Sequence, residues 1–225
     1  TIDGFKSLMI LDEAPCRPLD QSRSGLNLGE GAAFVVLQNP KVAKKSYCAL
    51  AGYANANDAF HQTAVSDDGY GPQMAMRGAL EMAKCSPSDD SYITLHGTGT
   101  PNNDASETTA IKAIWGSKMP PLSSTKAFTG HTLAAAGAVE AVFSVLAIIN
   151  NQAWANVNVS NPIEGTSPLR HTANIDVNVV VSNSFGFGGN CSSLVFKPIP
   201  HILHQIFGNS DLISRVQFAL PFQIR

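Results

Sequence analysis

The chain has 225 residues, of which 44% are hydrophobic and 14% are charged, and its formal net charge is −2. This length and composition predict a soluble globular protein that can bury a core as one domain or as two small ones. The balanced charge offers no basic field, so we expect no nucleic-acid partner. The four cysteines lie far apart without a Cys-x-x-Cys pair. This pattern favours reduced thiols in the cytoplasm over a disulfide framework or a metal site.

Apolar runs bounded by Gly and Pro predict the elements of the first half of the chain. They are a short helix over 2–11, a buried strand over 32–37, a strand over 47–53, a helix over 72–84, a strand over 91–95 and a helix over 105–115. Gly25, Gly29 and Gly31 come just before the strand at 32–37 and predict a close approach between backbone segments. Neither a signal peptide nor an initiator Met is present in TIDGFKSLMI, so residue 1 is not expected to be the natural beginning.

A glycine-rich block, His96-Gly97-Thr98-Gly99-Thr100, joins the strand over 91–95 to the helix over 105–115. The glycines permit a tight turn that places the His96 imidazole at the end of a strand, with the Thr98 and Thr100 hydroxyls ready to bond its second nitrogen. A phosphate-binding loop is the alternative. It is disfavoured because no Lys follows the glycines.

Residues 123–150, SSTKAFTGHTLAAAGAVEAVFSVLAIIN, contain a nearly uncharged run of about five helical turns. A helix that is apolar on all sides is expected to be buried rather than to lie on the surface. Its Gly and many Ala residues favour a core helix over a membrane span. Glu140 is then a buried carboxylate that needs a partner, and Lys126 is the nearest cation in sequence. His131 lies where the helix should begin, where the helix dipole favours a neutral imidazole; the alternative is a His satisfied by backbone, with Lys126 in solvent.

The last part of the chain predicts strands over 175–181 and 193–196, separated by Asn-Ser-Phe-Gly-Phe-Gly-Gly at 183–189. Phe185 and Phe187 in this block fit simple hairpin packing. The glycines would also let Phe187 swing and expose its backbone amide, as a gate or an oxyanion donor requires.

Four blocks, SGLNLGEGA, HGTGTPNNDASE, SSTKAFTGHTLAAAGAVEA and NSFGFGG, resemble in order and spacing the C-terminal part of a β-ketoacyl-acyl carrier protein synthase. The resemblance covers about residues 1–197. It implies an α/β, thiolase-like fold, in which two similar halves pack their helices together between two sheets. Residues 1–39 would end the N-terminal half and residues 40–197 would form the C-terminal half. Residues 198–225 would be an extension without a counterpart in the family.

The resemblance also implies roles for individual residues. His96 and His131 would be the paired histidines that stabilise the enolate formed when malonyl-carrier protein loses CO2. Lys126 and Glu140 would be a buried ion pair that organises them. Phe187 would be the gating aromatic, and Phe185, Thr98 and Thr100 would support the site. The implied partners are acyl carrier protein and acyl and malonyl thioesters, in a homodimer or heterodimer, without a cofactor or metal.

The chain departs from the family at its nucleophile. The Ala-Cys-Ser-Ser-like block of the family is absent, so no nucleophile is expected in this chain. Cys191-Ser192-Ser193 imitates that block, but an outgoing strand usually buries such a side chain. The chain is therefore interpreted as a condensing-enzyme fragment. The alternative is a non-catalytic partner that resembles a chain-length factor, and a thiolase-type or hydrolase activity fits the blocks less well.

Overall fold

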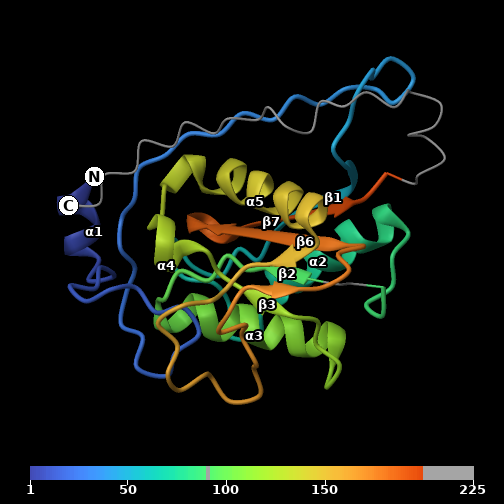
Figure 1. Ribbon diagram of the computed structural model, residues 1–225. Coiled ribbons are helices and arrows are strands. Elements are labelled where there is room, and N and C mark those ends of the chain that lie inside the picture. Colours follow the sequence, from blue (N-terminus) through green and yellow to red (C-terminus); the bar gives the residue numbers. More distant parts are fainter. Residues whose placement is uncertain (90–91, 200–225) are drawn as a thin grey trace.

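The computed structural model describes residues 1–89 and 92–199, and its main element is a five-stranded mixed sheet (Figure 1). The helices are α1 (Ile2–Ser7), α2 (Tyr70–Ala83), α3 (Pro101–Trp115), α4 (Lys126–Thr129) and α5 (Ala136–Asn150), with single 3-10 turns η1 (Leu133–Ala135) and η2 (Phe187–Gly189). The strands are β1 (Ala49–Asn57), β2 (Tyr92–Thr94), β3 (Leu122–Ser123), β4 (Gln152–Ala153), β5 (Ala173–Asn174), β6 (Val180–Gly186) and β7 (Asn190–Lys197). The predicted α/β class is confirmed.

The strand order in the main sheet is β1-β7-β6-β2-β3. The strands β6, β2 and β3 run parallel, whereas β1 and β7 pair antiparallel at the other side of the sheet. Parallel neighbours place their carboxyl ends at one edge, which is where sites form in open α/β sheets. This edge therefore receives the residues that follow β2, β3 and β6.

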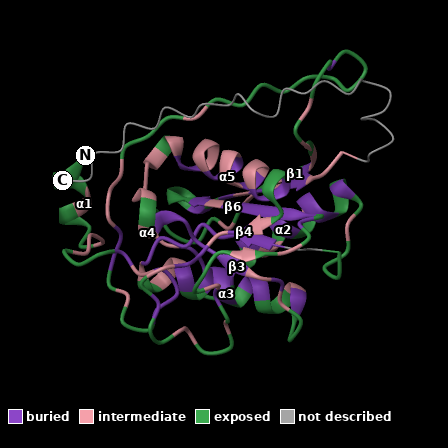
Figure 2. Cartoon of the chain, viewed as in Figure 1, coloured by how far each residue is buried: buried purple, intermediate pink, exposed green. Residues whose placement is uncertain are grey.

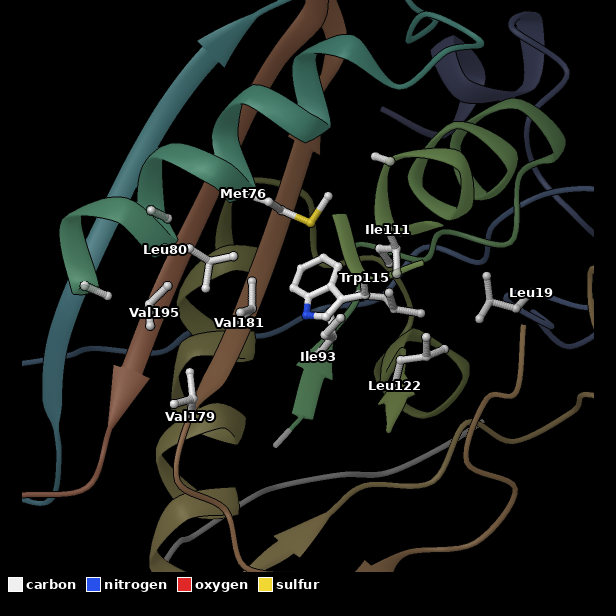
Figure 3. Packing of buried hydrophobic residues seen from close by; sticks show 14 residues of the cluster. Leu19, Met76, Leu80, Ile93, Ile111, Trp115, Leu122, Val179, Val181 and Val195 are labelled. Atoms are coloured by element: carbon white, nitrogen blue, oxygen red, sulfur yellow. The ribbon is translucent and has the colours of Figure 1, made fainter. Parts of the chain in front are cut away.

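Two apolar clusters cover the opposite faces of the sheet. Successive residues of β6 divide between them: Val181 belongs to the cluster with α2 and α3, and Val180 belongs to the cluster with α5. This alternation follows from the two-residue period of a strand. Figure 3 shows the first cluster, in which Met76, Ile111 and Trp115 from the two helices pack around Ile93 and Val181. The buried residues in Figure 2 accordingly concentrate along the sheet and the helix faces turned toward it.

The N-terminal segment is held against the sheet domain by polar contacts with residues far along the chain. The buried Asp20 carboxylate accepts hydrogen bonds from the backbone N–H groups of Ser160 and Asn161 at 2.7 and 2.8 Å. The Asn156 amide donates to the Pro18 carbonyl at 3.0 Å. The segment around Pro18 and Asp20 is therefore fixed against the sheet domain, although it precedes the domain's first strand.

The buried strand predicted over 32–37 is wrong for the described residues. The segment has no strand assignment, and Phe34 and Val36 are 92% and 83% exposed. It runs as an extended chain past α5 in Figure 1. A run that is apolar on both sides becomes a strand only where neighbouring strands accept its hydrogen bonds and both faces are covered. The described part of this chain supplies neither.

The strand predicted over 175–181 is also wrong in position, since β6 begins at Val180 and continues through Asn183 to Gly186. The apolar pattern at 175–181 arises because Val177 and Val179 are buried without belonging to a strand. The polar Asn183 is accommodated in the buried strand because its amide has partners of its own, described below.

Other predicted elements are present with shifted ends. The strand expected over 47–53 is β1, the helix expected over 72–84 is α2, and the helix expected over 105–115 begins four residues earlier at Pro101. The predicted helix over 2–11 ends at Ser7, and the strand expected over 193–196 is β7. The first residue of the strand predicted over 91–95 and nearly all of the predicted extension over 198–225 lie outside the described residues.

The long apolar run is divided into α4, η1 and α5. Gly130, at φ 65°, ends α4 and separates it from the turn before α5. The sheet buries only one side of α5, and Ile149 on another side is 42% exposed, so the predicted all-round burial is wrong for the described structure. One helical stretch of the described chain, Leu133–Asn150, is long and apolar enough to cross a membrane by length and composition alone. Its Ala141, Ala147 and Ile148 pack on the sheet, as in a core helix.

Candidate active site

Three parallel strands deliver the candidate site residues to one edge of the sheet. His96 follows β2, Lys126 follows β3, and Phe185 lies near the end of β6. Helix α5 packs on one face of the sheet and contributes the buried Glu140. The site therefore depends on the parallel pairing of β2 with β3 and β6, which the sequence alone does not specify.

A buried carboxylate fixes the backbone at His96. The two Glu107 carboxylate oxygens accept hydrogen bonds from the backbone N–H groups of His96 and Gly97, each at 2.9 Å. The Asn183 amide donates to the same carboxylate at 3.0 Å, and the Ser193 hydroxyl donates to the Asn183 carbonyl oxygen at 2.8 Å. Burial raises the pKa of Glu107 to about 7, against the opposing effect of these donors. This series of hydrogen bonds thus joins the turn after β2 to both α3 and the β6–β7 hairpin.

Lys126 lies between His96 and Glu140. Its ammonium donates to the His96 carbonyl at 2.5 Å, lies 3.4 Å from His96 Nδ1 and forms an ion pair with Glu140. The side chains of Lys126 and Glu140 are 1% and 3% exposed. Because an ammonium only donates, His96 Nδ1 must accept, and the ring proton is then on Nε2. The predicted partnership of Lys126 and Glu140 is present in the structure.

His131 approaches His96 from the segment between α4 and η1. The two ring centroids are 5.3 Å apart, and the ring planes meet at 82°. The backbone N–H of Leu133 donates to His131 Nδ1 at 3.1 Å. This bond makes Nδ1 an acceptor, so the proton of the neutral His131 ring is also on Nε2.

Both imidazoles are held in the neutral form. Burial and, next, the Lys126 charge lower the pKa of His96 well below its usual value. The same two causes lower the pKa of His131 to about 3. At neutral pH the pair therefore presents two uncharged rings, each able to donate one N–H.

The Thr98 and Thr100 hydroxyls do not bond the His96 ring as expected. They bond each other at 2.8 Å, within the turn formed by Gly97 and Gly99 at φ 40° and 79°. The Nδ1 atom of His96 faces the Lys126 ammonium instead. The threonines therefore shape the turn behind the imidazole.

The two phenylalanines of the FGFGG block lie in different surroundings. Phe185 is buried and its ring is tilted against His96, with centroids 5.8 Å apart. Phe187, in η2, is 48% exposed and stacks on Phe5 of α1 at 6.2 Å. Phe185 thus forms a wall of the histidine pair, while Phe187 lies at the surface of the β6–β7 turn.

Cys191 lacks the properties of an activated nucleophile. It is buried in β7 beside Ala75 and Phe185. Burial and then the neighbouring Asp58 and Glu107 charges raise its pKa to about 12. Burial also raises the pKa of Cys16 to about 11. Catalytic thiols need a lowered pKa and access to solvent, and neither of these two thiols has them.

Sequence reasoning missed Asp104, Glu107 and Asn183 as supports of the site. Asp104 is fully buried and accepts hydrogen bonds from the backbone N–H groups of Leu19 and Gly99, at 2.9 and 3.2 Å. The signal in the sequence was the spacing of Asp104 and Glu107, three residues apart on a helix, which places both carboxylates on one side. That side faces the backbone at 96–99 and not solvent.

Comparison with known proteins agrees with this geometry. Residues 47–160 match the family model of the beta-ketoacyl synthase C-terminal domain. The 3-oxoacyl-[acyl-carrier-protein] synthase 2 of Vibrio harveyi is 40% identical over 193 residues, which is 81% of this chain and 46% of that protein. The chain belongs to the β-ketoacyl synthase family. It spans about half the length of the curated relatives it matches.

Solved structures show the same relationship. The ishigamide ketosynthase/chain length factor superposes with a TM-score of 0.83 at 31% identity, over 88% of this chain and 50% of that one. A type II PKS acyl-carrier protein in complex with its ketosynthase, bound to the hexaketide, superposes with a TM-score of 0.79 at 29% identity, over 88% of this chain and 52% of that one. The predicted thiolase-like fold is confirmed as that of a ketosynthase C-terminal half.

Proposed function

We propose that this chain carries the decarboxylating half of a β-ketoacyl-acyl carrier protein synthase site. One observation carries the proposal: His96 and His131 lie edge to face at 5.3 Å, and each has an occupied Nδ1 and therefore an N–H on Nε2. Two neutral donors at this separation are suited to one oxygen that gains negative charge.

The chemistry that such a pair supports is loss of CO2 from a malonyl thioester. The bond between the α-carbon and the carboxylate breaks, and its electron pair moves onto the thioester as an enolate whose oxygen accepts both Nε2–H bonds. The enolate carbon then attacks an acyl thioester, and the thiolate of that thioester leaves. The histidine bonds strengthen as the enolate charge develops, so they favour the transition state over the substrate.

The remaining predicted site residues take supporting roles in this proposal. Lys126, paired with Glu140, holds His96 and keeps it from being protonated. Phe185 excludes water from one side of the pair, and Thr98 and Thr100 shape the turn behind it. Phe187 acts as the gate, with its backbone amide in the oxyanion hole for acyl transfer.

The partners that we propose are acyl carrier protein, the acyl and malonyl thioesters it carries, and a second synthase subunit, in the cytoplasm. One of the similar structures is an acyl-carrier protein in complex with its ketosynthase, and two others pair a ketosynthase with a chain length factor. The nucleophilic Cys belongs to a part of the synthase outside this chain. Residues 1–39 then end the N-terminal half, and 40–197 form the C-terminal half.

A chain-length-factor-like role is the second candidate. It is favoured by the same structural relatives and by the absence of an activated thiol at Cys16 and Cys191. The complete set of His96, His131, Lys126 and Glu140 argues against it, since a subunit without catalysis has no need for two neutral histidines around a buried cation.

The proposal is tested by decarboxylation of malonyl-carrier protein in the complete synthase. His96→Ala and His131→Ala should each lower the rate about 100- to 1000-fold, because each removes one preorganised donor. Transfer of the acyl group to the nucleophilic Cys should be retained. His171→Ala, at an exposed residue outside the proposed site, is the control and should leave both steps unchanged. Normal decarboxylation in either variant would remove that histidine from the mechanism. If the unaltered synthase does not decarboxylate malonyl-carrier protein, the chain-length-factor role is favoured.

A further inference from the structure

The N-terminal segment makes direct backbone contact with His131. The backbone N–H of His131 donates to the Asn27 carbonyl at 2.7 Å, and the N–H of Gly29 donates to the His131 carbonyl at 3.1 Å. Together these bonds form an isolated parallel bridge between Leu28 and His131. Both hydrogen bonds hold the backbone of the histidine itself, across about a hundred residues of sequence.

Only glycine fits where these two segments meet. A Cβ on Gly29 would lie 2.0 Å from the Thr129 carbonyl oxygen, and a Cβ on Gly130 would lie 2.7 Å from the Gly29 nitrogen. Both atoms that would be met belong to backbone, so neither clash can be relieved by a rotamer change. Real Cβ contacts are not shorter than 3.0 Å, so a methyl group at position 29 requires the two segments to separate by about 1 Å.

The segment is itself anchored through the side chain of Asn27. Its amide donates to the carbonyls of Asp12 and Ala14 at 2.9 and 3.1 Å, and its carbonyl oxygen accepts from the backbone N–H of Cys16 at 2.6 Å. Segment 27–29 is thus fixed on one side by the 12–16 loop, and it fixes His131 on the other.

We propose that residues 27–29 are a positioning element for His131, which sets the distance of its imidazole from that of His96 through the backbone bridge and the contact of Gly29 with Thr129. This inference rests on the proposed role of His131 as a donor. Gly29 of SGLNLGEGA is in this view part of the site's geometry and not only a turn residue before the apolar run. Gly31 is not part of this element, because a Cβ there would meet only the Thr132 and Val139 side chains at 3.4 and 3.8 Å.

The element also controls the surroundings of the His131 ring. Among the described residues, the ring is influenced by Lys126 of α4, which is itself paired with Glu140 of α5, and contacted by His96 after β2. The low pKa of His131 depends on burial first and on Lys126 second. A displaced ring should gain water, and its pKa should then rise toward the ordinary value of a histidine.

The test compares Gly29→Ala with Gly31→Ala in the complete synthase. Gly29→Ala should lower kcat for malonyl decarboxylation about 100-fold with little change in KM, as expected for a displacement of about 1 Å within a preorganised site. Gly31→Ala should retain the rate. Equal rates for the two variants and the unaltered synthase, with Gly29→Ala folded, would overturn the proposal.

A second readout does not depend on activity. Nuclear magnetic resonance titration of the imidazoles should show His131 neutral down to about pH 4 in the unaltered protein and in Gly31→Ala. In Gly29→Ala its midpoint should move up by more than one pH unit, while His96 stays neutral. If Gly29→Ala does not fold, Asn27→Ala decides, because it releases the segment without a clash and should give a smaller shift in the same direction. An unchanged His131 titration in a folded variant overturns the positioning role. If the titration shifts as expected but the unaltered synthase does not decarboxylate malonyl-carrier protein, only the proposed function is contradicted.

Discussion

At the scale of single residues, the Lys126–Glu140 pair is a buried ion pair that is costly to disturb. Both side chains are nearly inaccessible, and the pair lies beneath His96. Burial raises the pKa of Glu140, and the neighbouring ammonium opposes that rise. Each charge is tolerated in the interior only because the other is present.

Removing one partner should therefore destabilise the protein more than removing both. Lys126→Met or Glu140→Gln alone should cost about 3 to 5 kcal/mol in the free energy of unfolding, because each leaves a buried group unpaired. The double variant should cost less than either single variant, yet its condensation rate should stay low because His96 loses its donor. Urea unfolding and condensation rates across the double-mutant cycle measure both effects. Strictly additive stability losses would show that the side chains do not interact.

Glu107 should make stability depend on pH. Its pKa is about 7 in the folded protein and near 4.5 when unfolded, so between these values the folded state holds a proton that the unfolded state has lost. Stability is then fully present below about pH 4.5 and falls as the pH rises through 7. The loss from this one group should be up to about 3 kcal/mol.

The measurement is urea unfolding at pH 5 and pH 7.5 for the unaltered protein, Glu107→Gln and the exposed control Glu81→Gln. Glu107→Gln should lose this part of the pH dependence. It should also be less stable at pH 5 by about 1 to 3 kcal/mol, because its amide NH2 cannot accept from one of the two backbone N–H groups. A pH dependence that is the same in all three proteins would mean that Glu107 does not titrate in this range.

At the scale of elements, the longest run of exposed large apolar residues in the described chain is 34–37. This run belongs to the extended segment that passes α5 in Figure 1, and Ile149 of α5 is itself 42% exposed. Exposed apolar surface of this extent marks an interaction surface. The curated relatives are about twice as long as this chain, and we expect residues of the synthase outside this chain to cover the surface.

Hydrogen exchange should show whether segment 32–37 is open in this chain alone and covered in the complete synthase. The backbone amides of residues 32–37 should exchange rapidly in this chain alone, because they lack strand partners among the described residues. In the complete synthase they should be strongly protected, as expected of a strand with neighbours on both sides. The amides of β6, which pair in the sheet of this chain, serve as the protected reference in both samples. Rapid exchange at 32–37 in the complete protein would exclude a strand there.

At the scale of the whole molecule, the described residues hold a donor pair, while the buried thiols of Cys16 and Cys191 are not activated. Incubation of this chain alone with radiolabelled acyl-carrier protein should leave it unlabelled, since an acyl-enzyme needs an accessible thiolate. The pKa of Cys191 is about 12, and its burial in β7 denies access as well. Cys191→Ser is the matched control and should behave identically. A covalent label that disappears in Cys191→Ser would identify that thiol as the nucleophile.

The sequence by itself determined what local chemistry can specify. Apolar periods predicted α2, α3, β1 and β7 with small errors at their ends, and the glycine pattern of 96–100 predicted a tight turn that carries a histidine. The charge at Glu140 within an apolar helix predicted a buried pair with Lys126. These inferences succeeded because they depend on short-range periodicity and on the cost of burying a charge.

Only the tertiary structure decided which residues meet across long distances. The contact of Asn27 and Gly29 with His131, the use of Glu107 to hold the backbone at His96, and the partner of His96 Nδ1 follow from strand order and helix placement. The failure at 32–37 has the same origin, since a strand exists only with a hydrogen-bonded neighbour. An apolar run indicates that a segment will be buried, whereas the packing of the whole fold decides which surface buries it.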